Sequence, residues 1–121
     1  MHEAQFHLFT YGSLKSSSPQ ARALLRGCER VGAGEVRGTL FDVGDYPALI
    51  LDGGGVARGE IWRCPAELLL ELDRYEGVAE GLFRRAAVKI GDVACWVYVA
   101  GPRLGAKLVP EARIESGEWN P

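Results

Sequence analysis

Residues 36–63 read VRGTLFDVGDYPALILDGGGVARGEIWR, and they indicate the architecture more clearly than any other part of the chain. Three short segments in this region are rich in β-branched, aromatic and other apolar residues, as strands are: 36–43, 48–51 and 56–63. Glycine-rich turns at 44–45 and 52–55 separate them, because glycine tolerates the positive φ angles of tight turns. We therefore expect three consecutive antiparallel strands here.

The flanking sequence supplies further strands and two helices. Residues 5–11 are typical of a strand, and residues 83–90 and 93–100 alternate as the two arms of a hairpin around Gly91-Asp92. Ser17 or Ser18 before Pro19 predicts a helix start for a short apolar stripe that ends near Gly27. Pro65 opens a second helix through residue 75.

About six strands and two helices without βαβ repeats indicate an α+β domain. A core this small favours a mixed sheet curled towards a barrel, with the helices covering its open ends. At 121 residues, the chain is expected to form one domain over 1–121.

Composition excludes several classes of protein. Sixteen acidic against fourteen basic residues give a formal net charge of −2, so no nucleic-acid partner is expected. No apolar run approaches the length of a membrane span, and the first residues do not resemble a signal peptide. We therefore expect a cytoplasmic protein without a membrane partner, whose oligomeric state the sequence does not specify.

The rare residues narrow the possible chemistry. The chain has three cysteines, Cys28, Cys64 and Cys95, an odd number, and they are far apart in the sequence. We therefore expect buried free thiols and neither a disulfide framework nor a zinc site. His2 and His7 are the only histidines, and no metal-binding spacing exists. If the protein is an enzyme, a carboxylate is the expected base.

The first candidate site is Tyr11-Gly12-Ser13-Leu14, where a strand ends before a loop and a helix. Unpaired backbone N–H groups at such a place can bind a carboxylate or an oxyanion. Gly12 would let a ligand approach the backbone closely. Taken alone, this tetrapeptide is more often an ordinary strand-to-loop turn.

The second candidate is LDRYEG, residues 72–77. On a helix, Glu76 follows Leu69 and Leu72 by seven and four positions, so it continues the edge of their apolar stripe. A carboxylate carried towards an apolar interior loses water and its pKa rises, which makes it a useful base near neutral pH. The alternative is a solvated glutamate at a fraying helix end. Spacing does not decide between them, because Gly77 can break the helix.

Two weaker features favour structural roles. Arg84-Arg85 is expected to be a surface pair, although one of them could anchor an anion. The three tryptophans are expected in the core, although they could line a pocket: Trp62, Trp96 and Trp119.

Taken together, these segments resemble the gamma-glutamylcyclotransferase-like, or AIG2-like, family, including its small bacterial members and gamma-glutamylamine cyclotransferases. The resemblance covers nearly the whole chain, and the order and spacing of its pieces make it specific. Those pieces are Tyr11–Leu14, Asp42–Ala48, Gly59-Glu60, Leu72–Gly77 and Ile114–Trp119.

The resemblance implies a barrel-like mixed sheet with a cavity at one end, Glu76 as catalytic acid/base, and substrate held through backbone groups of the Tyr11–Leu14 loop. It implies release of 5-oxoproline from a small gamma-glutamyl substrate, without metal or organic cofactor. Phe83 stands where many relatives have tyrosine, so a hydroxyl contact to the substrate is lost or supplied elsewhere. The alternatives are a protein that binds a carboxylate or amino acid without turnover and an interaction domain with a vestigial cavity. The leaving amine is left open: an amino acid, a lysine isopeptide, a polyamine or an antibiotic precursor.

Overall fold

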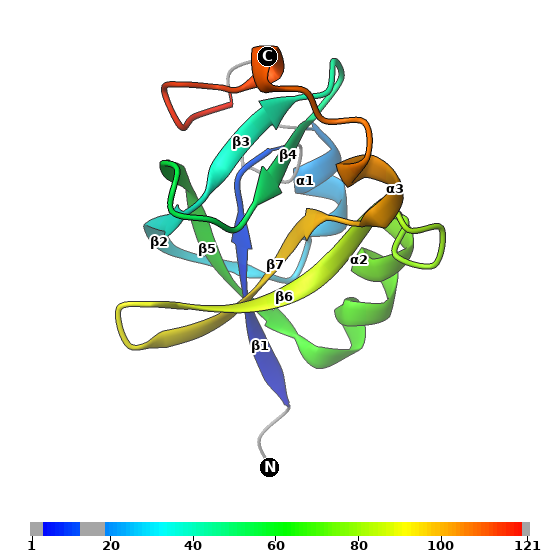
Figure 1. The fold of residues 1–121 in the computed structure, drawn as a ribbon. Coiled ribbons are helices and arrows are strands. Elements are labelled where there is room, and N and C mark those ends of the chain that lie inside the picture. The colour runs from blue at the N-terminus through cyan, green and yellow to red at the C-terminus, as the bar shows by residue number, and fades with distance from the viewer. Residues whose placement is uncertain (1–3, 13–18, 120–121) are drawn as a thin grey trace.

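The largest element is a five-stranded mixed sheet with the order β2-β5-β1-β7-β6, seen in a computed structural model that describes residues 4–12 and 19–119 (Figure 1). Its strands are β1 (Gln5–Thr10), β2 (Glu29–Arg37), β5 (Val56–Pro65), β6 (Phe83–Ile90) and β7 (Val93–Ala100). β1 runs parallel to β7, whereas the other neighbours are antiparallel. A second sheet contains β3 (Thr39–Asp42) and β4 (Pro47–Ile50).

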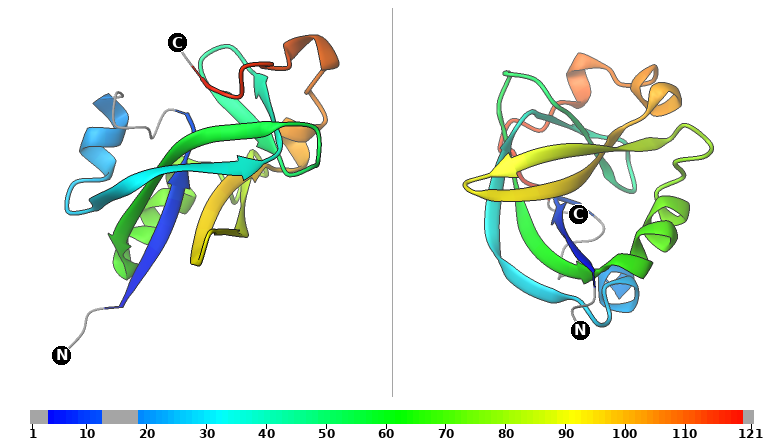
Figure 2. Two further views of the ribbon diagram at one scale, coloured as in Figure 1. Left: turned by 90° about the vertical axis from the view of Figure 1, so that its left-hand side faces the viewer. Right: turned by 90° about the horizontal axis from the view of Figure 1, so that it is seen from below.

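The five-stranded sheet is strongly curled, so that its two edge strands approach each other. A Cβ added to Gly34 of β2 would lie 3.5 Å from Cγ2 of Ile90 on β6 and 3.0 Å from Cδ1 of Ile61 on β5. Seen from below, β2 and β5 lie on one side, the β6–β7 hairpin crosses above them, and α2 closes the opposite side (Figure 2). The predicted α+β fold with a barrel-like mixed sheet is confirmed.

Strand pairing differs from the sequence-based expectation in two respects. The expected strand 36–43 is divided at Gly38, where a Cβ would lie 2.6 Å from the carbonyl oxygen of Ile50, and its first part belongs to a longer strand, β2. The first two of the three segments are antiparallel partners as expected, but the third does not pair with the second. β3 pairs with β4, but β5 pairs with β1 and β2. β2 was missed because its sequence, ERVGAGEVR, lacks the regular apolar alternation of a half-buried strand.

The helical segments are short: α1 (Pro19–Leu24), α2 (Leu69–Tyr75) and α3 (Pro102–Gly105), with 3₁₀ turns at Ala66–Leu68 and Pro110–Ala112. α1 ends three residues before Gly27, near which its end was expected, and α2 with the preceding turn matches the helix expected over 65–75. In the described ranges, no helix has the length and hydrophobicity needed to cross a membrane.

Two apolar clusters hold the layers together, one on each face of the large sheet. The first lies under α1 and α2 and includes Leu8, Leu25, Cys64, Leu68, Leu72 and Tyr98. The second fills the interior of the curl beneath β3 and β4 and includes Phe9, Tyr11, Leu40, Leu49, Val97 and Val99. β4 joins the two, since Ala48 belongs to the first cluster and Leu49 to the second.

Candidate active site

A cavity of about 170 Å³ opens where β1 ends, β4 begins and α2 ends. Aromatic and aliphatic side chains dominate its wall, and Glu76 is the one carboxylate among the described lining residues. The wall comprises Phe9, Thr10, Tyr11, Gly12, Tyr46, Pro47, Tyr75, Glu76, Leu82, Phe83 and Tyr98. The cavity therefore brings together the described part of the first candidate segment and the key residue of the second, which are more than sixty residues apart in sequence.

Glu76 is held at the end of α2 by a helix-capping motif. Its backbone keeps helical angles, φ −84° and ψ 0°, while Gly77 turns to φ +65°. The N–H of Val78 donates to the carbonyl of Asp73 at 3.0 Å, and that of Gly77 donates to the carbonyl of Arg74 at 3.1 Å. This is the Schellman pattern of a glycine-terminated helix. Gly77 therefore ends the helix after Glu76 without disturbing the direction in which Glu76 projects.

The environment of Glu76 changes its acidity. Burial raises the pKa of this carboxyl from 4.5 to about 8. Loss of water is the sole cause of the rise, and no cation or donor in the described part of the chain offsets it. The alternative of a fully solvated glutamate does not fit this position. A carboxyl with this pKa can accept a proton and return it near neutral pH.

Tyr11 and Gly12 line the same cavity as Glu76 and are tightly packed. Tyr11 is buried, and its hydroxyl donates to the backbone carbonyl of Tyr98. Burial raises the pKa of Tyr11 well above its ordinary value, and the charge of Glu76 adds to the rise. A Cβ on Gly12 would lie only 2.6 Å from Cγ of Pro47, so this position has no room for a side chain. Ser13 and Leu14 lie outside the described residues.

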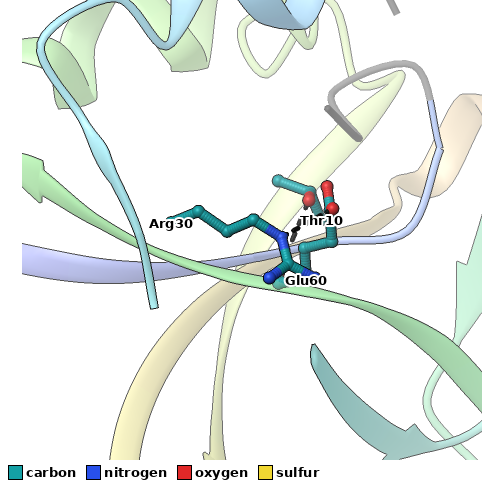
Figure 3. A network of polar contacts seen from close by, with 3 residues as sticks. All are labelled: Thr10, Arg30 and Glu60. Carbon is teal, nitrogen blue, oxygen red and sulfur yellow. Dashed lines mark hydrogen bonds and ion pairs between the residues drawn. The ribbon is translucent and has the colours of Figure 1, made fainter. Parts of the chain in front are cut away.

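Thr10 connects the cavity wall to an ion pair on the neighbouring strands (Figure 3). It faces Glu60 in the β1–β5 register and its hydroxyl donates to the Glu60 carbonyl at 3.4 Å. The Glu60 carboxylate pairs with Nε of Arg30 on β2 at 2.9 Å. A Cβ on Gly59 would lie 1.9 Å from the Thr10 carbonyl oxygen, so glycine is required beside it. The Gly59-Glu60 segment therefore supports the end of β1.

A second polar network, which the sequence did not reveal, ties α2 to the sheet behind Glu76. The Tyr98 hydroxyl donates to Oδ1 of Asp73 at 2.6 Å, and Nε of Arg85 pairs with the same oxygen at 2.9 Å. The Arg85 guanidinium also lies 4.7 Å from the centre of the Trp96 ring. Arg84 is exposed, as expected for a surface arginine, whereas Arg85 is half-buried and binds the Asp73 carboxylate, so alternation along β6 turns only one of the two outward.

Aromatic rings form the remaining wall. Phe83 and Tyr46 lie against each other with ring centres 5.8 Å apart. Phe83 thus lines the cavity without offering a hydroxyl, whereas Tyr46 belongs to the Asp42–Ala48 segment. The tryptophans do not line this wall, because Trp62 and Trp96 pack against the first apolar cluster and Trp119 is buried. The sequence analysis did not single out Tyr98. Alternation along β7 could have placed its side chain on the same face of the sheet as that of Trp96.

Possible metal ligands are dispersed over the structure. Within residues 4–12 and 19–119, no three histidine, cysteine, aspartate or glutamate side chains lie close enough to hold an ion. The chemistry that the described wall offers is therefore that of one acid/base carboxyl, the backbone beside Gly12 and the hydroxyls of Thr10 and the tyrosines.

Comparison with known proteins places the chain in a family. A family model described as gamma-glutamyl cyclotransferase, AIG2-like, matches residues 8–121. No curated protein matches the chain. An AIG2-like protein from Mus musculus superposes with a TM-score of 0.79 at 25% identity, covering 98% of this chain and 90% of that one. The protein ytfP from Escherichia coli superposes with a TM-score of 0.73 at 27% identity, covering 94% and 96%.

A structure named gamma-glutamyl cyclotransferase superposes with a TM-score of 0.67 over 80% of this chain and 67% of that one. At 17% identity, this likeness concerns the fold alone. The family model, in contrast, spans almost the whole sequence, including the residues of β1 and α2 that meet at the cavity. The chain therefore belongs to the gamma-glutamyl cyclotransferase, AIG2-like family.

Proposed function

We propose that the protein is an enzyme that cyclises a small gamma-glutamyl compound to 5-oxoproline and releases a free amine, with Glu76 as its general acid/base. The observation that carries the proposal is the position of Glu76. It is the one carboxylate on the described wall of an apolar cavity, and its pKa of about 8 suits proton transfer near neutral pH. Membership of the family supports a cyclotransferase-type reaction in general.

The reaction needs no nucleophile from the protein. The α-ammonium of the substrate gives a proton to the Glu76 carboxylate, and the free amine attacks the γ-carbonyl carbon. The bond from that carbon to the leaving nitrogen then breaks as Glu76 returns the proton to this nitrogen. After attack, the α-nitrogen still carries a second proton, and Glu76 takes this proton as well and passes it to the departing amine. In all, the α-nitrogen loses two protons as the ammonium becomes a lactam N–H, and the leaving nitrogen gains the same two. Glu76 therefore ends the cycle as it began.

The cavity would contribute by holding the glutamyl chain folded. Attack within one molecule gains up to about 7–11 kcal/mol when the reacting atoms are well oriented. Backbone N–H groups at Gly12 and in the Ser13-Leu14 segment are proposed to bind the α-carboxylate or the developing oxyanion. The apolar wall of Phe9, Leu82 and Phe83 keeps water away, which strengthens both interactions.

The decisive experiment compares wild-type protein with Glu76→Gln on a panel of gamma-glutamyl amines and dipeptides, with 5-oxoproline release as the readout. Glutamine has the same shape but cannot accept the proton, so the rate should fall by about 10²–10⁴-fold. Glu71→Gln is the matched control, because it removes an exposed carboxylate from the same helix and should keep full activity. Full turnover by Glu76→Gln would refute the assignment.

The same panel separates the enzyme from a protein that only binds. A binding protein would show ligand-induced stabilisation without product. For the enzyme, Glu76 must be ionised to accept the proton and the substrate's α-ammonium must still carry it, so kcat/KM should rise with pH towards about 8 and fall again as that ammonium deprotonates.

A further inference from the structure

Two of the three cysteines are cross-strand neighbours at the end of the large sheet away from the cavity. Glu29, the first residue of β2, lies opposite Arg63 of β5 in an antiparallel register. Extending this register by one position sets Cys28, which immediately precedes β2, opposite Cys64. Cys64 also faces Phe6, near the start of β1, whereas the cavity lies at Thr10–Gly12 near the end of that strand. Four residues of strand separate these points, a distance of about 13 Å.

The two thiols are in contact but differ in their access to water. Cys64 is fully buried and Cys28 is half-buried, and both pack in the apolar cluster under α1 and α2. Burial raises the pKa of both thiols, and a hydrogen bond between the two side chains lowers the pKa of Cys28 while raising that of Cys64. Cys28 is therefore the thiol of this pair that a reagent in water reaches.

We propose that Cys28 and Cys64 are a redox-active pair that a low-molecular-weight disulfide converts to a cross-strand disulfide. The Cys28 thiolate attacks the disulfide, forms a mixed disulfide and expels the first small thiol. Cys64 then loses its proton and attacks Sγ of Cys28, which expels the second small thiol. Two protein thiols are oxidised and one small disulfide is reduced to two thiols, so electrons and protons balance.

The extended register favours this bond. Opposed residues in antiparallel strands have Cα atoms about 4.5–5.5 Å apart, within the range of about 4.4–6.8 Å that disulfides span. The bond would close a loop that contains β2, β3, β4 and most of β5. Cross-linking restricts the unfolded chain, so the oxidised protein should unfold at a higher urea concentration than the reduced protein. The inference goes beyond the proposed activity, since neither thiol lines the cavity.

The test incubates the folded protein with glutathione disulfide, blocks the remaining thiols after denaturation and maps the peptides by mass spectrometry. We expect a monomer that has lost two hydrogen atoms, a peptide pair joined through residues 28 and 64, and a higher urea midpoint that dithiothreitol reverses. Cys28→Ser should show none of these changes, whereas Cys95→Ala should show all of them. Cys95 is the internal control because it lies in the other apolar cluster, on β7.

Unchanged mass, a mixed disulfide on Cys28 that never resolves, or a cross-link to Cys95 would overturn the proposal. Release of 5-oxoproline by the oxidised protein is a separate readout. Because the pair is remote from the cavity, any turnover measured before oxidation should persist after it. If the protein releases no 5-oxoproline, the test of the cross-link between residues 28 and 64 still stands. If no cross-link forms, the test of 5-oxoproline release still stands.

Discussion

Replacement of Glu76 by glutamine should make the folded protein more resistant to unfolding than wild type at alkaline pH. Burial raises the pKa of Glu76 from 4.5, its ordinary value, to about 8 in the folded state. Between these two values, the folded protein keeps a proton that the unfolded chain releases. The stability of wild type therefore falls as pH rises through this interval. The side chain of glutamine does not titrate, so the stability of Glu76→Gln should not show this decrease with pH.

The size of the effect follows from the shift. One proton difference changes the free energy of unfolding by about 1.4 kcal/mol per pH unit. Over the interval from 4.5 to about 8, this amounts to a loss of up to about 5 kcal/mol for wild type relative to Glu76→Gln. The benefit of the protonated carboxyl is fully present below pH 4.5 and is lost once the pH passes about 8. Small domains are stable by only about 5–15 kcal/mol, so the difference is large.

The assay is urea unfolding of both proteins followed by tryptophan fluorescence at a series of pH values from about 5 to about 9, the range over which such a group titrates. The difference between the two free energies should change steadily with pH and then level off. Glu71→Gln, an exposed change on the same helix, should give a curve parallel to wild type. If the gap between wild type and Glu76→Gln stays constant over this range, Glu76 is not withdrawn from water, and its proposed role as a base near neutral pH loses its physical basis.

Three other substitutions test the cavity wall at Gly12 and the packing of α2 against the sheet. Gly12→Ala places a Cβ 2.6 Å from Pro47, so the end of β1 must shift and turnover should fall at least about tenfold. Gly53→Ala, whose Cβ would meet no atom of the described residues within 4 Å, should leave turnover unchanged. Asp73→Asn weakens the ion pair and hydrogen bond behind α2, and urea unfolding should show a loss of about 1–3 kcal/mol. Leu72→Ala empties a fully buried site under the same helix and should cost about 2–5 kcal/mol by the same measurement; a cost below about 1 kcal/mol would contradict the described packing.

Local sequence determined the elements whose signals lie close together along the chain. The β6–β7 hairpin was predicted from alternation on both sides of Gly91-Asp92, and the helix that carries Glu76 from the spacing of its leucines. Gly77 predicted where this helix ends, because glycine readily adopts the positive φ of the capping residue. These features depend on residues within one or two turns of each other, so a short window of sequence contains the necessary information.

Tertiary structure alone decided how strands that are distant in sequence pair and what each side chain faces. The segments that flank Gly53–Gly55 look like a hairpin, yet β5 pairs with β1 and β2, since long-range packing outweighs the local turn signal. Spacing placed Glu76 at the edge of an apolar stripe but left its contact with water open. Whether a carboxylate loses water depends on what packs against it, and here the cavity wall comes from strands far away in the sequence.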